Sequence, residues 1–277
     1  YHLTDAIPAD ERPVVFIGPY EHHSNELPWR ESIADVVIID EDADGHVSLD
    51  HLESELIRHA DRTTLIGSFS AASNVTGIIT DTVAVSTLLH RHGALSLWDY
   101  AAAAPYVPIE MGSDADGNLA YKDAVFISPH KLIGGPGTPG VLVARRELFT
   151  NRVPDVPGGG TVRYVSTAEH DYHPEIEHRE EAGTPAIVES IRAGLVFQLK
   201  EAVGADVIEA KESEFVRRAI ARWEQHPNIN VLGSHEADRL SIVSFVIRHG
   251  SDDRYLHHNY VVALLKDLIG IQSRGGC

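Results

Sequence analysis

Cysteine, lysine and long apolar runs are scarce in this chain of 277 residues, and each scarcity excludes a class of protein. The single cysteine, Cys277, cannot form an internal disulfide, so nothing calls for an oxidising compartment. No apolar run reaches the roughly 18 residues that suggest a membrane span, and the segment 1–10 lacks the basic flank and apolar stretch of a signal peptide. We therefore expect a soluble, cytoplasmic protein.

Positive charge is also scarce. Lysine and arginine number 23 against 41 aspartates and glutamates, which gives a formal net charge of -18. This charge repels phosphate backbones and anionic lipids, so we expect small-molecule or protein partners, with no nucleic acid and no membrane. Only five of the basic residues are lysines, and Lys131 stands out among them because a Gly-rich stretch follows it.

Short apolar runs that are rich in β-branched residues recur through the first half of the chain. The predicted strands are 36–39, 64–68, 95–98, 124–128 and 141–144. Amphipathic segments separate several of them, and this alternation predicts an α/β fold with a mostly parallel, doubly wound sheet flanked by helices. With 43% hydrophobic residues, the chain can form a large domain and part of a smaller one.

Two helices are expected between these strands. Ser48 is typical of an N-cap, and the helix after it would turn four apolar residues inward: Leu49, Leu52, Leu56 and Ile57. The second helix lies between Thr80 and His92, with inward side chains at Val83, Leu88 and Leu89.

The second half of the chain begins with a loop at 153–161, which contains two prolines and three consecutive glycines. A long helical region is predicted over 186–224, strands joined by a polar turn over 229–247, and a helix near 260–268. We expect a large α/β domain over 1–205 and an incomplete small α+β domain over 206–277.

Polar residues follow several predicted strands. Asn74 comes after the strand that ends at Ser68, Asp99 closes the next strand, and Lys131 follows the one that ends at Ser128. In a parallel sheet these ends share an edge where ligands bind. There Lys131 would be partly desolvated, which favours the neutral amine that forms a Schiff base, and Asp99 could keep a pyridine nitrogen protonated. Taken singly, a strand-end aspartate is more often a structural or capping residue, and a loop lysine is more often simply solvated.

The combination resembles a known family. Ser128-Pro129-His130-Lys131 and the run Gly134–Val141 after it are similar to the lysine segment of class V aminotransferases and cysteine desulfurases, which use pyridoxal 5'-phosphate (PLP). Further similar segments are Glu21–Trp29, Ser73–Gly77, Gly158–Thr161, Glu181–Pro185 and Arg274–Cys277. The resemblance implies PLP fold type I, a homodimer with shared active sites, and an enzyme of the desulfurase and selenocysteine lyase branch.

The resemblance also implies residue roles. The expected catalytic residues are Lys131, which forms the Schiff base, His22, which stacks on the cofactor ring, and Asp99, which pairs with the pyridinium. The other expected cofactor contacts are Asn74 on the ring oxygen, Ser128 and His130 on the phosphate, and Thr161 in the loop that reaches the neighbouring subunit. Arg274 would grip the carboxylate of an amino-acid substrate.

Three departures from the family pattern leave alternatives open. Ala102 stands where desulfurases usually carry Gln, and the family's Gly/Thr-rich phosphate loop is not found before Glu21. Cys277 falls short of the position of the persulfide-forming cysteine. We therefore expect a truncated fragment. The alternatives are an aminotransferase, an epimerase or another lyase of the same family, or a piece inactive in isolation. The retained Lys131 and Asp99 argue against a non-catalytic scaffold.

A metal site is not expected. The segment 40–45 imitates the start of a calcium loop, but His51 stands at the twelfth position, where a bidentate glutamate is needed. The 17 histidines show no metal-binding spacing.

Overall fold

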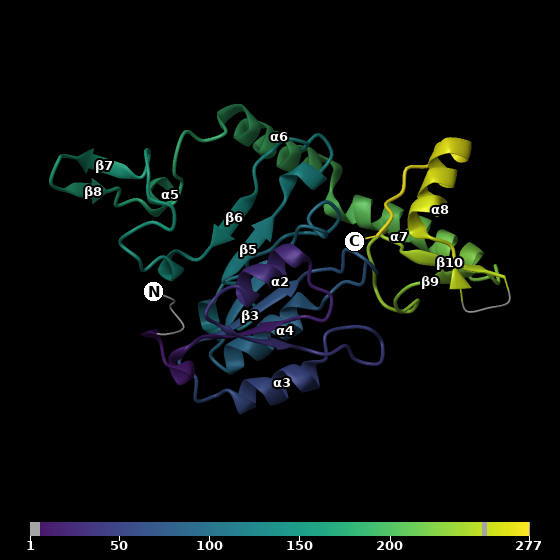
Figure 1. Ribbon diagram of the computed structural model, residues 1–277, viewed down its shortest axis with the longest axis horizontal. Helices are drawn as coiled ribbons and strands as arrows, with labels where there is room; N and C mark the ends of the chain where they lie inside the picture. Colours follow the sequence, from purple (N-terminus) through teal and green to yellow (C-terminus); the bar gives the residue numbers. More distant parts are fainter. Residues whose placement is uncertain (1–5, 251–253, 277) are drawn as a thin grey trace.

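The computed structural model describes residues 6–250 and 254–276, and its centre is one twisted sheet (Figure 1). Among the described residues the sheet order is β2-β1-β3-β4-β5-β6. The strands are β1 (Val14–Ile17), β2 (Asp35–Ile38), β3 (Leu65–Ser70), β4 (Leu95–Asp99), β5 (Ala124–Ile127) and β6 (Val141–Ala144). All pairs are parallel except β5 with β6. The predicted mostly parallel α/β sheet is confirmed.

One strand of this sheet, β1, was not predicted. It lies between β2 and β3, and all four of its residues are buried. The signal was present, because an apolar run stands between Pro13 and Gly18, two residues that often bound a strand.

Helices α2 (His23–Arg30), α3 (Leu49–Arg58) and α4 (Thr82–Arg91) form the first three crossovers. Ser48 caps α3 as predicted, and its hydroxyl accepts a hydrogen bond from the amide of His51 (3.2 Å). The stripe that α3 buries is narrower than predicted, because it consists of Leu52 and Leu56 while Leu49 and Ile57 are exposed.

The prediction for α4 was right for Leu88 and Leu89, which are buried, and wrong for Val83, which is 57% exposed. Val85 lies inward in its place. Two positions along a helix correspond to about 200° around its axis, so a helix that buries Val85 exposes Val83.

The rest of the chain extends from this sheet (Figure 1). The loop 153–161 is confirmed, and after it come the hairpin β7 (Val162–Val165) and β8 (His170–Tyr172), then α5 (Ile176–Arg179). The predicted helical region 186–224 is two helices, α6 (Ile187–Val203) and α7 (Ala205–Trp223). They are separated at Gly204, whose φ of +89° is one that glycine tolerates best.

The final segment forms a smaller antiparallel sheet and a helix. Its strands are β9 (Ile229–Val231), β10 (Phe245–His249) and β11 (Arg254–Tyr255), in the order β11-β10-β9. The helix α8 (His258–Leu264) continues as a π-helical turn over Leu265–Ile269. The predicted strands and helix of this end are therefore confirmed, while the domain division at residue 205 stays a prediction.

The segment 238–244 of this end is joined to the loop after β3. The amide of Ile79 donates to the Asp238 carbonyl (2.9 Å), and the amide of Leu240 donates to the Gly77 carbonyl (2.8 Å). Arg239 is buried, and its guanidinium donates to backbone carbonyls, among them that of Thr76. Burial lowers the pKa of Arg239. The C-terminal part thus holds residues 76–79 by their backbone.

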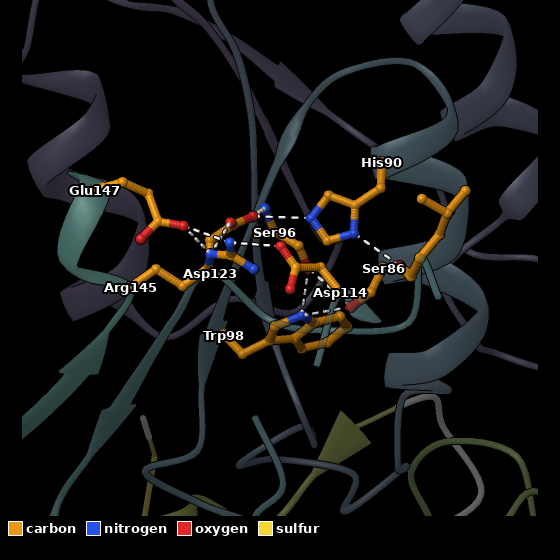
Figure 2. A network of polar contacts seen from close by, with 9 residues as sticks. Ser86, His90, Ser96, Trp98, Asp114, Asp123, Arg145 and Glu147 are labelled. Carbon is orange, nitrogen blue, oxygen red and sulfur yellow. Dashed lines mark hydrogen bonds and ion pairs between the residues drawn. The ribbon is translucent and has the colours of Figure 1, made fainter. Parts of the chain in front are cut away.

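A buried polar network closes the amino end of the sheet (Figure 2). Asp123, directly before β5, accepts hydrogen bonds from the amide of Ser96 (2.8 Å) and from Nε2 of His90 (2.9 Å). The Nδ1 of His90 lies 2.7 Å from the Leu119 carbonyl oxygen, so both ring nitrogens of His90 face oxygen atoms. Trp98, fully buried, donates to the Ser96 hydroxyl (2.8 Å).

Replacing Asp123 should destabilise the protein strongly. Asp123→Ala leaves the buried His90 and the Ser96 amide without their acceptor, so the free energy of unfolding should fall by about 3 to 5 kcal/mol in urea denaturation. Asp114→Ala is the control, because it removes an exposed carboxylate that pairs with Arg145 in the same region. Equal stability of the two variants would contradict a structural role for the buried pair.

Candidate active site

The carboxyl ends of four neighbouring parallel strands gather most of the predicted cofactor residues. In the sheet, β1, β3, β4 and β5 are adjacent and parallel, so the segments that follow them start from one edge. His22 follows β1, Asn74 follows β3, Asp99 ends β4, and the segment 128–131 follows β5. Open α/β sheets bind ligands at this edge.

Asp99 is held at the end of β4. It pairs in register with Ser70 of β3 and Phe126 of β5, and its side chain is partly buried. One carboxylate oxygen, Oδ1, accepts a hydrogen bond from the amide of Ala101 (2.7 Å). This bond restricts the rotation of a carboxylate that the strand places at the edge of the sheet.

His22 is the N-cap of α2. Its Nδ1 accepts a hydrogen bond from the amide of Ser24 (3.1 Å), so in the neutral ring the proton lies on Nε2. The cap fixes the imidazole at the start of the helix, and the side chain remains partly exposed.

Asn74 lies in a tight loop. The hydroxyl of Ser73, which is fully buried, accepts hydrogen bonds from the amides of Val75 (3.2 Å) and Thr76 (3.1 Å). Gly77 closes the loop with a φ of +79°, and a Cβ there would lie 2.6 Å from the Ile242 carbonyl oxygen. Local hydrogen bonds and the C-terminal segment therefore fix the backbone that carries Asn74.

Lys131 ends a short 3-10 helix, η3 (Pro129–Lys131), after β5. Its amide donates to the Ser128 carbonyl (3.0 Å). The expectation of a partly desolvated lysine is wrong for this structure, because Lys131 and His130 are exposed and Ser128 is partly buried. The physical reason is position: η3 follows the carboxyl end of β5, and the packing of α6 against η3 leaves the Lys131 side chain exposed.

One glycine of the run after Lys131, Gly135, is required by sterics. The chain folds back so closely that a Cβ on Gly135 would lie 1.9 Å from the Pro129 carbonyl oxygen. The amide of Gly135 donates to the Leu132 carbonyl (2.9 Å), and Arg192 of α6 donates to the Pro136 carbonyl (2.9 Å). Glycine at 135 thus sets the turn that carries Lys131.

Two predicted site residues do not lie at this edge. Thr161 is buried in the turn before β7, where its hydroxyl donates to the Gly158 carbonyl (2.7 Å). Arg274 is exposed in the segment after the π-helical turn. Cys277 lies outside the described residues. Their predicted roles stay predictions.

Sequence reasoning missed Glu21. It was quoted only as the first residue of the segment Glu21–Trp29, yet its carboxyl is among the best connected polar groups at this edge, with partners on β3 and α2. Burial raises the pKa of Glu21 above its usual range, and Asp99 contributes in the same direction. No local pattern distinguishes such a glutamate from a solvated one, because two of its four donors, the amide and the hydroxyl of Ser70, lie on a strand that is distant in the sequence.

The side chains at this edge fit PLP by their chemistry. A carboxylate, Asp99, can pair with a protonated ring nitrogen, and an amide, Asn74, can donate to a ring oxygen. An amine, Lys131, can bond to an aldehyde carbon, while Ser128 and His130 offer a hydroxyl and an imidazole to a phosphate.

Other candidate sites are weaker. A cavity of about 750 Å³ lies between the segment 106–108, α7 and residues 235–241, and none of the predicted cofactor residues is part of its lining. Within residues 6–250 and 254–276, no group of three or more His, Cys, Asp or Glu side chains is arranged to hold a metal ion. In the same residues, no helix has the length and apolarity that a membrane crossing demands.

The turn after Lys131 can be tested by adding one methyl group. Gly135→Ala should lower the free energy of unfolding by about 2 kcal/mol or more, because the Cβ would collide with the Pro129 backbone. Gly140→Ala is the matched control, since its Cβ would meet the Ile127 carbonyl oxygen at an ordinary 3.8 Å. Urea denaturation of both variants measures the difference. If Gly135→Ala were as stable as Gly140→Ala, the tight turn would be incorrect.

Comparison with known proteins gives a consistent answer. The family described as Aminotransferase class-V matches residues 4–277. A probable cysteine desulfurase of Halalkalibacterium halodurans is 28% identical over 95% of this chain and 60% of its own length. Probable cysteine desulfurase 2 of Mycobacterium leprae is 30% identical over 86% of this chain and 55% of its own length. The chain therefore spans about 60% of the length of such relatives.

Solved structures agree. The apo cysteine desulfurase of Thermococcus onnurineus NA1 covers 98% of this chain and 64% of its own, with a TM-score of 0.80 and 25% identity. The cysteine desulfurase CsdA of Escherichia coli covers 95% of this chain and 62% of its own, with a TM-score of 0.78 and 26% identity. A structure of C-DES with glycine covalently linked to its PLP cofactor is 17% identical, with a TM-score of 0.73, and shows likeness of fold alone.

Proposed function

The chain belongs to the class V aminotransferase family, whose members include PLP-dependent enzymes of fold type I, and from this premise we propose a PLP-dependent enzyme that acts on an amino acid in the manner of a cysteine desulfurase. The observation that carries the proposal is the shared strand edge. His22, Asn74, Asp99 and the segment 128–131 follow four adjacent parallel strands.

The cofactor, when bound, withdraws electrons from the substrate's Cα. The chain's own residues would hold it and move the proton. The amine of Lys131 would anchor the cofactor and then carry the proton to or from Cα, and the Asp99 carboxylate would keep a proton on the ring nitrogen. The imidazole of His22 would lie against the ring. Arg274 is proposed as the clamp for the substrate carboxylate.

Transamination, epimerisation or another lyase reaction is the second candidate, and Ala102 favours it. This alanine stands three residues after Asp99, and its methyl group cannot donate a hydrogen bond to the cofactor ring. A desulfurase converts cysteine to alanine and transferred sulfur without a keto acid. An aminotransferase requires a keto-acid acceptor, so product analysis with and without one separates the two reactions.

Assembly and location complete the proposal. Apolar side chains at helical spacing are exposed along α6, and this stripe supports the expected homodimer. Its residues are Ile187, Val188, Ile191, Leu195 and Leu199. The single cysteine of the chain supports a cytoplasmic location.

Trapping of the cofactor on one lysine tests the proposal. The chain is incubated with PLP, reduced with borohydride and digested, and mass spectrometry should find the pyridoxyl group on the Lys131 peptide, because a reduced carbon–nitrogen bond survives digestion. Lys131→Ala should lose the label, and Lys211→Ala, which removes an exposed lysine of α7, should keep it. Labelling spread over several lysines, or retained in Lys131→Ala, would contradict the assignment.

A further inference from the structure

Glu21 is partly buried, and four hydrogen-bond donors surround its carboxyl. Its Oε2 accepts from the Ser70 hydroxyl (2.7 Å) and from Nδ2 of Asn25 (2.7 Å), and its Oε1 accepts from the amides of Ser70 (2.9 Å) and Gly18 (3.2 Å). These bonds offset part of the cost of burying the carboxyl.

The four donors come from both sides of His22. Gly18 directly follows β1, Asn25 lies in the first turn of α2, and Ser70 is the last residue of β3. Asn25 is itself buried, and its Oδ1 accepts from the hydroxyl of Ser68 on the same strand (2.8 Å). The carboxyl of Glu21 thus ties the beginning and end of the segment 18–25 to one strand.

The backbone is shaped around this carboxyl. A Cβ on Gly18 would lie 2.6 Å from the Glu21 Oε1, so the bond to the Gly18 amide depends on glycine there. Packing alone would not need such a group, because an apolar side chain could fill the same space without the cost of desolvation. The directed bonds therefore point to a positional role.

We propose that Glu21 is a positioning residue for His22: its carboxyl fixes the segment 18–25 against the end of β3 and so holds the His22 imidazole at the cofactor edge. The inference rests on the proposed role of His22 as the residue that lies against the cofactor ring. Glu21 would act through His22 and not by contacting the cofactor itself.

A double-mutant cycle measures whether Glu21 acts through His22. The dissociation constant of PLP is determined for the unaltered chain, Glu21→Gln, His22→Ala and the double variant. Glutamine keeps the shape of the side chain and replaces one acceptor by a donor, so Glu21→Gln should raise the dissociation constant about tenfold. The double variant should be no weaker than His22→Ala. Glu26→Gln, which removes an ion pair with Arg30 on the same helix, should bind like the unaltered chain.

A second measurement needs no cofactor. Amide hydrogen exchange of the ligand-free chain should be about tenfold faster over 18–25 in Glu21→Gln and unchanged there in Glu26→Gln. Thermal unfolding of each variant separates a local effect from a global one, because global destabilisation would speed exchange in every strand of the sheet.

The outcomes divide cleanly. Multiplying effects in the double variant, or unaltered exchange over 18–25 in Glu21→Gln, would overturn the inference. If His22→Ala binds PLP like the unaltered chain, the proposed role of His22 is wrong, and the positioning role of Glu21 is then wrong as well. If no variant binds PLP, the exchange comparison decides whether Glu21 holds the segment.

Discussion

Parallel pairing of β1, β3, β4 and β5 is the constraint on which the site depends. Parallel neighbours point the same way, so every polar residue that follows one of these strands reaches the same edge of the sheet. The two edges then differ in character. The amino end is closed by the buried pair of His90 and Asp123, and the carboxyl end carries the partly exposed groups that a ligand can reach.

The sequence predicted the sheet because fully buried parallel strands appear as continuous apolar runs. Errors remained. The apolar run Val14–Ile17 was not taken as a strand, and the inward face of α4 contains Val85 instead of Val83. In both cases the local pattern is present, but packing against distant residues decides how it is used.

The sequence predicted that His22, Asn74, Asp99 and the segment 128–131 follow strands of one sheet, and it did not predict their surroundings. The segment that ends in Lys131 can be recognised from its sequence motif, whereas the exposure of Lys131 depends on which elements cover it. The role of Gly135 as the residue that permits close return to Pro129 follows only from coordinates. Glu21 shows the same limit, since two of its four donors, the amide and the hydroxyl of Ser70, lie 49 positions away in the sequence.

The loop that carries Asn74 links the strand edge of the proposed site to the C-terminal part of the chain. Arg239 binds the Thr76 carbonyl, and the Ser244 hydroxyl donates to the Val75 carbonyl (2.6 Å). Because Gly77 lies against the backbone of Ile242, a shift of the segment 238–244 cannot leave residues 74–77 in place. The position of Asn74 is therefore set by residues that are more than a hundred positions away, which makes the C-terminal part a structural component of the proposed site.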